Sequence, residues 1–163
     1  MKTSNHRESV WRFQAQVFNH MLSNQMSCWL FDPASLTARL IAACDGRFHV
    51  RVMSQAWGSP LFNELKRLNM RSREVALIRE VFLYCDDEPW VFARTVIPRS
   101  TLSGKQKYLA NLGSRPLGAV LFADPNMRRD HFEVACMRPG ELLFNHANQL
   151  YADKPEYIWG RRS

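Results

Sequence analysis

The chain has 163 residues, of which 46% are apolar, which suits one compact domain with its own core and argues against disorder. The 22 basic residues outnumber the 15 acidic ones, and the net charge of +7 attracts anions without choosing among small carboxylates, nucleic acid and anionic membranes. No apolar run approaches the roughly 20 residues that a bilayer-spanning helix needs, so we expect a soluble protein.

The first half of the chain predicts three helices and a strand. Apolar residues at helical spacing predict a helix over 8–22, although a loose arm would accommodate them equally well. A second helix is expected within 32–44, where a proline and a serine can open it. Alternating apolar residues predict a half-buried strand over 47–57, and a short amphipathic helix follows over 60–68.

The strongest strand pair in the sequence is expected over 75–85 and 88–98, with Asp86 and Asp87 in the turn. The rest of the chain predicts, in order, a short helix over 101–113 capped by Ser103 and ended by Gly113, a loop around Pro116 and Gly118 with an apolar run after it, a strand over 128–137, a helix over 139–151 and a strand over 156–163. Because strands and helices do not alternate regularly, we expect an α+β fold: a single domain over 1–163 with an antiparallel sheet and helices on one side.

The four cysteines, Cys28, Cys44, Cys85 and Cys136, are widely and irregularly spaced, and no C-x-x-C pair occurs. The N-terminal segment has no apolar signal core. We therefore expect reduced cysteines and a cytoplasmic protein.

Two arginines occupy interior positions of the predicted strand pair. A two-residue turn would place Cys85 opposite Glu88, and continued pairing would place Arg79 opposite Arg94 on the same face. Opposed like charges are destabilising, so an anion is expected between them. An internal carboxylate and a bound ligand are equally good candidates, and a slip of one residue would separate the arginines onto opposite faces.

Other motifs are weak. The segment Ser103-Gly104-Lys105 lacks the upstream glycine of a phosphate-binding loop, and no G-x-S-x-G motif of a hydrolase occurs. The five histidines fall in separate predicted elements without the spacing of a metal site. Basic runs are too short to favour a nucleic-acid-binding module, which rests on the net charge alone.

Four segments together resemble one family: "IREVFLYCDDEPWVFARTVIPRSTLSG", "LGSRPLGAVLF", "RRDHFEVA" and "WGRRS", in this order, are similar to chorismate lyase, the chorismate–pyruvate lyase of ubiquinone biosynthesis. The resemblance implies a single domain with an antiparallel sheet flanked by helices and an internal active-site cavity closed by flaps. It also implies conversion of chorismate to 4-hydroxybenzoate and pyruvate, without metal or cofactor.

The resemblance also implies roles for four residues. Arg79 matches the family's substrate arginine and would be both catalytic and substrate-binding. Arg94 matches a further family arginine, either a second anion contact or part of the cavity wall. Leu117 matches a position whose backbone contacts the ligand, and Leu36 lies where the family has an apolar contact with the ring.

In the family a further strand follows the last motif and supplies a glutamate that faces the substrate arginine. No residue of this sequence matches it, so we expect a shortened chorismate lyase with weak activity or none. The alternative is a non-catalytic domain of the same fold that senses a small carboxylate, as in the effector-binding half of a class of bacterial transcription regulators. We expect a monomer that binds neither nucleic acid nor membrane.

Overall fold

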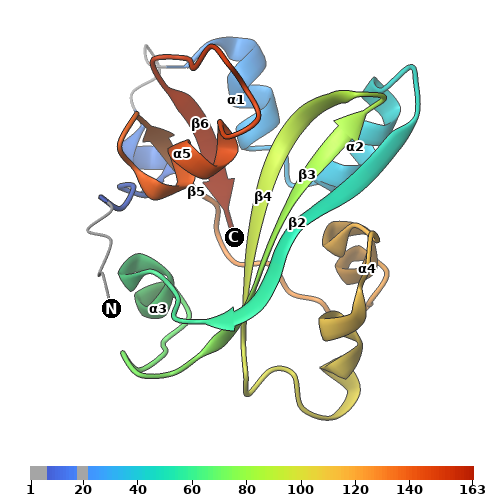
Figure 1. Ribbon diagram of the computed structural model, residues 1–163, viewed down its shortest axis with the longest axis vertical. Helices are drawn as coiled ribbons and strands as arrows, with labels where there is room; N and C mark the ends of the chain where they lie inside the picture. Colours follow the sequence, from blue (N-terminus) through green and yellow to red (C-terminus); the bar gives the residue numbers. More distant parts are fainter. Residues whose placement is uncertain (1–6, 18–21) are drawn as a thin grey trace. The chain divides into compact units, whose positions relative to one another are not determined.

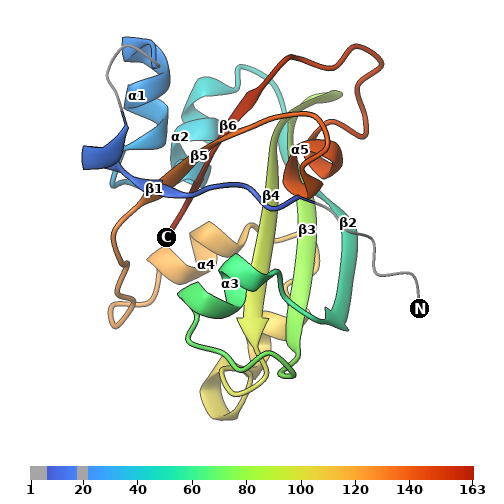
Figure 2. The same ribbon diagram turned by 90° about the vertical axis from the view of Figure 1, so that its left-hand side faces the viewer.

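A computed structural model describes residues 7–17 and 22–163 of the chain (Figure 1, Figure 2). The chain divides into two compact units. The first combines the N-terminal part up to Leu36 with Pro125–Ser163, and the second is Thr37–Asp124. Each unit contains one three-stranded antiparallel sheet, so the α+β class is confirmed, whereas the single sheet expected from the sequence is wrong.

The first unit contains the sheet β1-β5-β6, in that strand order, and two short helices. The strands expected near residues 128–137 and 156–163 are confirmed by β5 and β6, and the helix expected over 139–151 by α5. The sequence did not predict α1, which is one short helix whose first turn is capped by the Ser23 side chain, the acceptor of a 3.1 Å bond from the Met26 N–H. The bounds are β1 Arg12–Phe13, α1 Asn24–Leu30, β5 Glu133–Met137, α5 Leu142–Ala147 and β6 Ile158–Arg162.

The N-terminal helix expected over 8–22 is wrong where the structure describes that segment. Arg12 and Phe13 pair with β5 as strand β1, and a 3₁₀ turn, η1 (Gln14–Gln16), follows. The Gln16 side chain accepts the Phe13 N–H at 3.0 Å, a local bond that competes with a continuing helix. Residues 18–21 lie outside the described residues.

The second unit contains the sheet β2-β3-β4, with β3 in the middle. These strands and the helices α2 and α3 confirm the elements expected from the sequence, including the Asp86-Asp87 turn that pairs Cys85 with Glu88. The bounds are α2 Leu36–Ala43, β2 Phe48–Gly58, α3 Phe62–Arg67, β3 Ala76–Cys85, β4 Glu88–Pro98, η3 Gly104–Asn111 and α4 Leu117–Phe122.

A bulge in β4 changes the expected register of the hairpin. Tyr84 pairs with Pro89 but Leu83 pairs with Val91, so Trp90 is an extra residue on β4. From there to the end of the ladder every partner is displaced by one residue. Arg79 consequently pairs with Thr95, and the expected pairing of Arg79 with Arg94 is wrong.

Helices cover both faces of this sheet, not one face as expected. Figure 1 and Figure 2 show α3 on one side of the strands and α4 on the other. On the α4 side, Leu77 and Ile97 of the sheet form a buried cluster with Leu109 of η3, and Leu117 of α4 packs against it. This face of the sheet carries the candidate site described below.

Two expectations about the segment after β4 are corrected. The helix over 101–113 is a 3₁₀ helix, η3, and the hydroxyl of Ser103 donates to the Ser100 carbonyl at 2.8 Å and does not cap it. The loop expected around Pro116 and Gly118 is the short helix α4. Gly118 allows this helix to approach Thr37 of α2, because a Cβ at this position would lie 2.9 Å from the Thr37 hydroxyl.

None of the helices within residues 7–17 and 22–163 has the length and apolar character needed to cross a bilayer.

Candidate active site

Arg79 lies in the central strand β3, and its side chain is buried, with 2% of the residue exposed. The guanidinium donates three hydrogen bonds: from Nη1 to Gln55 Oε1 at 3.1 Å, and from Nη2 to the carbonyls of Gly113 at 2.8 Å and Arg115 at 3.4 Å. All three acceptors are neutral, and within the described part of the chain no carboxylate forms an ion pair with Arg79. Removal from water lowers the pKa of Arg79 below its ordinary value.

The number of donors leaves room for a ligand. A guanidinium has five N–H groups in a planar fork, and three hydrogen bonds leave two N–H groups for another acceptor. A buried cation whose charge has no counter-ion attracts an anion strongly, because its cost of burial is repaid only by a charged partner. A carboxylate oxygen can accept a charge-assisted hydrogen bond from such an N–H group.

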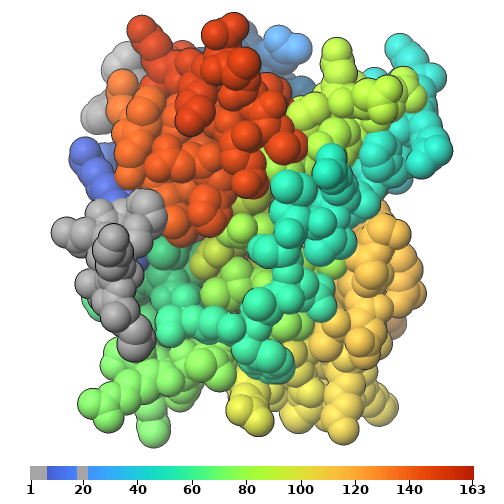
Figure 3. Space-filling model, in the orientation of Figure 1, coloured from blue at the N-terminus to red at the C-terminus, as the bar shows by residue number. Residues whose placement is uncertain are grey.

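The segment from Gly113 to Pro116 contacts Arg79 through two of its backbone carbonyls. Gly113 has φ of +56°, a left-handed conformation that glycine adopts at little cost, and the chain reverses here after η3. While the carbonyls of this segment accept from Arg79, its other residues line an open hollow of about 350 Å³. Figure 3 shows the surface of β2 running beside that of the η3–α4 segment. The hollow is lined by Arg47, Phe48, His49, Val50, Ser114 and Pro116.

Arg94 lies on the opposite face of the sheet. It pairs directly with Glu80, the neighbour of Arg79 in sequence, and successive residues of a strand point to opposite faces. Its Nε and Nη2 donate to the two carboxylate oxygens of Glu64 at 2.7 and 3.1 Å, and Nη1 donates to Glu80 Oε1 at 2.8 Å. The internal carboxylate considered from the sequence is therefore the partner of Arg94, whereas no carboxylate in the described part of the chain pairs with Arg79.

The electrostatics of the two arginines differ accordingly. Burial alone would lower the pKa of Arg94, but hydrogen bonds to Glu64 and Glu80 and their negative charges raise it above its ordinary value. Glu64 also accepts the N–H of Leu61 at 2.8 Å, at the start of α3. Arg94 thus ties α3 to the sheet, and this cluster accounts for its guanidinium without a ligand.

The other two candidate residues occupy helix starts. Leu117 is the first residue of α4, and its half-buried side chain packs against the core cluster on the Arg79 face, so a ligand contact there would come from its backbone. Leu36 is the first residue of α2 and is half-buried. The structure thus brings Arg79 and the segment leading to Leu117 to the same face of the sheet and places Arg94 on the other.

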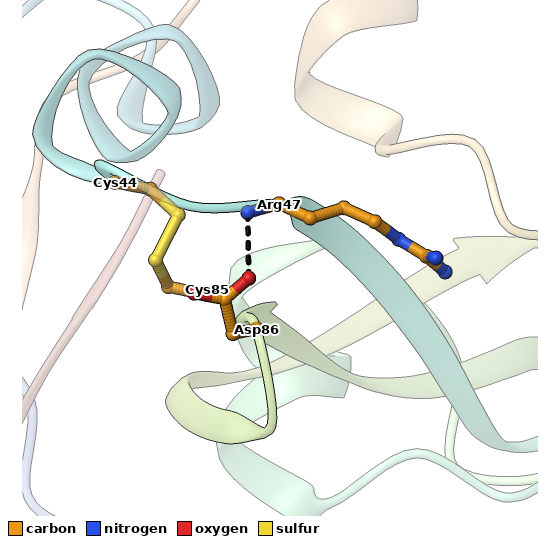
Figure 4. The surroundings of a disulfide bond; sticks show 4 residues. All are labelled: Cys44, Arg47, Cys85 and Asp86. Atoms are coloured by element: carbon orange, nitrogen blue, oxygen red, sulfur yellow. Dashed lines mark hydrogen bonds between the residues drawn. A yellow bond between two sulfur atoms is a disulfide. The ribbon is translucent and has the colours of Figure 1, made fainter.

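A disulfide joins Cys44, just after α2, to Cys85 at the end of β3 (Figure 4). The expectation of four reduced cysteines is therefore wrong. Cys44 and Cys85 are 41 residues apart in sequence, and the sequence does not show that the fold places Cys44 beside the hairpin turn. Next to the disulfide, Asp86 Oδ1 accepts the Arg47 N–H at 2.8 Å, and the Asp86 N–H donates to the Arg47 carbonyl at 2.9 Å. These bonds fix the backbone from which Arg47 reaches the hollow.

Sequence reasoning missed Gln55 and Arg47. Gln55 contacts Arg79 from the adjacent strand β2, directly opposite in the ladder, and Arg47 precedes β2 at the rim of the hollow. The alternation of Phe48, Val50 and Val52 would have placed Gln55 on the opposite, polar face of the strand, and only the irregularity between Val52 and Ser54 brings it opposite Arg79. Within the described residues, no group of three or more potential metal-binding side chains lies together.

Comparison with known proteins identifies the family. The family model described as chorismate lyase matches residues 6–163. A probable chorismate pyruvate-lyase of Methylococcus capsulatus is 41% identical over 138 residues, which are 85% of this chain and 84% of that protein. Proteins of the same name from Aromatoleum aromaticum and Pseudomonas aeruginosa are 41% and 42% identical, each over 83% of this chain and over 74% and 72% of their own lengths.

The family model matches nearly the whole chain and these relatives are more than 40% identical to it, so the chain belongs to the chorismate lyase family.

Proposed function

We propose that the protein cleaves chorismate to 4-hydroxybenzoate and pyruvate, in the context of ubiquinone biosynthesis. The observation that carries the proposal is the buried guanidinium of Arg79, whose acceptors in the described residues are all neutral and which retains donors for a substrate carboxylate. Chorismate carries two carboxylates, and its product 4-hydroxybenzoate carries one. The relatives named chorismate pyruvate-lyases support this substrate class.

Arg79 would bind a carboxylate through charge-assisted hydrogen bonds from N–H groups of its planar guanidinium, an arrangement that the ammonium of lysine cannot reproduce. The backbone near Leu117 would supply a further polar contact from the segment that already accepts hydrogen bonds from Arg79 through Gly113 and Arg115. The positive charge would also stabilise negative charge that develops on the enolpyruvyl group as its C–O bond breaks.

The reaction needs few further groups from the protein. Loss of pyruvate makes the ring aromatic, so the reaction runs downhill, and the site needs to hold the ring, remove water and assist proton movement. Among the described residues the acceptors of Arg79 are an amide oxygen and two backbone carbonyls, and no carboxylate bonds to it. An aromatic acid held by a buried arginine would leave slowly, so we expect product release to limit turnover.

Leu36, Arg94 and the state of the protein as a whole complete the proposal. Leu36 would contact the ring, and the protein would act as a single domain and a cytoplasmic monomer, without cofactor and without nucleic acid as a partner. Arg94 would act indirectly, because both of its carboxylate partners lie inside the fold.

The test is to mix the purified chain with chorismate and to quantify pyruvate and 4-hydroxybenzoate over time. Equal amounts of both products, abolished by Arg79→Ala, are expected. Saturable binding of 4-hydroxybenzoate without turnover would instead favour the sensing domain of the same fold, and the absence of both would overturn the proposal.

A further inference from the structure

We propose that Gln55 is a positioning residue for the substrate carboxylate, acting through Arg79. This inference rests on the proposed function, because it assigns to Gln55 the orientation of the guanidinium that binds the substrate. Nothing in the motifs that carry the family resemblance includes Gln55, which lies in β2 outside all four segments.

The amide of Gln55 contacts the guanidinium of Arg79. Gln55 and Arg79 are direct partners in the antiparallel ladder of β2 and β3, so their side chains leave the sheet on the same face. The Gln55 Oε1 accepts from Arg79 Nη1 at 3.1 Å, and its Nε2 donates to the Ala110 carbonyl at 2.7 Å. Only one orientation of the amide satisfies both contacts, because Arg79 can only donate and the carbonyl can only accept.

Gln55 and the two backbone carbonyls accept from different nitrogens of Arg79. The other two acceptors, the carbonyls of Gly113 and Arg115, both receive Nη2. Among the described residues, Gln55 is the one acceptor of Nη1. Without it the guanidinium would lose one of its three hydrogen bonds, and the directions of the N–H groups that remain for a carboxylate would be less well defined.

Gln55 also connects the guanidinium of Arg79 to η3. Through Ala110 the same amide is bonded to η3, whose end leads directly to Gly113 and Arg115. A glutamine supplies an acceptor and a donor at one place without adding charge, whereas an apolar side chain of the same size supplies neither. The amide therefore orients Arg79 and leaves its positive charge available to a substrate.

The experiment compares Gln55→Met, which keeps the length of the side chain and removes both hydrogen bonds, with Ser54→Ala as the matched control. Ser54 is the preceding residue of β2, and its hydroxyl donates at 3.4 Å to Glu80, on the face that carries Arg94. For Gln55→Met we expect KM for chorismate to rise about ten- to a hundredfold, the range for a hydrogen bond to a charged group, with kcat unchanged or raised because a more weakly bound product leaves faster. The control should keep the wild-type KM.

A double-mutant cycle with Arg79→Ala separates this role from a structural one. The dissociation constant of 4-hydroxybenzoate should rise in either single variant, and Gln55→Met should add nothing once Arg79 is absent. If Arg79→Ala binds normally, the proposed function is overturned. If Arg79→Ala loses binding while Gln55→Met binds and turns over like the wild type, only the positioning role is overturned.

Additive losses in the cycle would also overturn the positioning role, because they would mean that Gln55 acts independently of Arg79. If Gln55→Met does not fold, Gln55→Asn takes its place, since it keeps the amide but is one methylene too short to hold Nη1. A wild-type KM in that variant would refute the inference.

Discussion

Arg79 and Arg94 lie on neighbouring strands, and their guanidinium groups have partners of different charge. Arg94 donates to two carboxylates, whereas Arg79 donates to an amide oxygen and two backbone carbonyls. Removing a cation between two buried anions is costly to stability, whereas removing a cation without a counter-ion relieves a burial penalty. Substitution by alanine should therefore lower the stability of the fold at Arg94 and not at Arg79.

We expect Arg79→Ala to abolish measurable turnover of chorismate and to leave the melting temperature nearly unchanged. Arg79→Lys should restore little activity, because an ammonium group cannot reproduce the planar arrangement of N–H donors of a guanidinium. Steady-state kinetics and thermal unfolding of the three proteins provide the check. Near-normal kcat/KM in Arg79→Ala would contradict the assignment of this residue to the site.

Arg94→Ala should destabilise the fold by about 3–5 kcal/mol, because it leaves Glu64 and Glu80 buried without their cation. The free energy of unfolding from urea titrations measures the effect, and Arg51→Ala, which removes an exposed arginine of β2, is the control. A loss no larger than that of the control would show that the carboxylates find other partners.

At the scale of elements, the start of β2 and the β3–β4 turn are joined twice, by the Cys44–Cys85 disulfide and by the backbone of Arg47 with Asp86. A cross-link over 41 residues restricts the unfolded chain strongly. The joined region also carries Arg47, at the rim of the hollow. The stability of this part of the second unit should therefore depend on whether the disulfide is oxidised or reduced.

We expect Cys44→Ser with Cys85→Ser to lower the free energy of unfolding by about 4 kcal/mol, the loop-closure value for a bridge of this span. Urea unfolding without reductant measures the loss. In the presence of excess dithiothreitol the wild type and the double variant should become equally stable. A wild type that is insensitive to reductant and no more stable than the variant would argue against the cross-link.

Counting thiols gives an independent check on the same bond. Native protein should react first at the exposed Cys28, and more slowly at Cys136, whose half-buried position raises the pKa of its thiol and so reduces the thiolate present at pH 8. Unfolded protein should show two reactive thiols without reductant and four after reduction. Four thiols before reduction would contradict the disulfide.

At the scale of the whole molecule, a ligand that binds only the folded chain must raise its melting temperature with increasing concentration. We expect 4-hydroxybenzoate to do so, benzoate to do so less because it lacks the hydroxyl, and Arg79→Ala to abolish the shift. Thermal unfolding at several ligand concentrations measures this. A shift that persists in Arg79→Ala would place the binding site elsewhere.

Local pattern predicted most elements of this protein correctly. Alternating apolar residues indicated β2, β3 and β4, and the Asp86-Asp87 turn and the pairing of Cys85 with Glu88 followed from the length of the connection. The motifs around Arg79 and Leu117 were sufficient to indicate the family, because such motifs depend on residue type and spacing alone. Short elements such as α1 and α4 escaped, since one or two helical turns carry too little periodicity.

Tertiary packing decided the contacts on which the site depends. The bulge at Trp90 reverses which face Arg94 occupies relative to Arg79, and a single inserted residue of this kind has no local signature strong enough to set the register. The Cys44–Cys85 bond and the contact of Gln55 with Arg79 join residues 41 and 24 positions apart in sequence. Such partners are chosen by the closing of the sheet and the packing of helices on it, whereas a sequence pattern reports only which face of its own element a residue occupies.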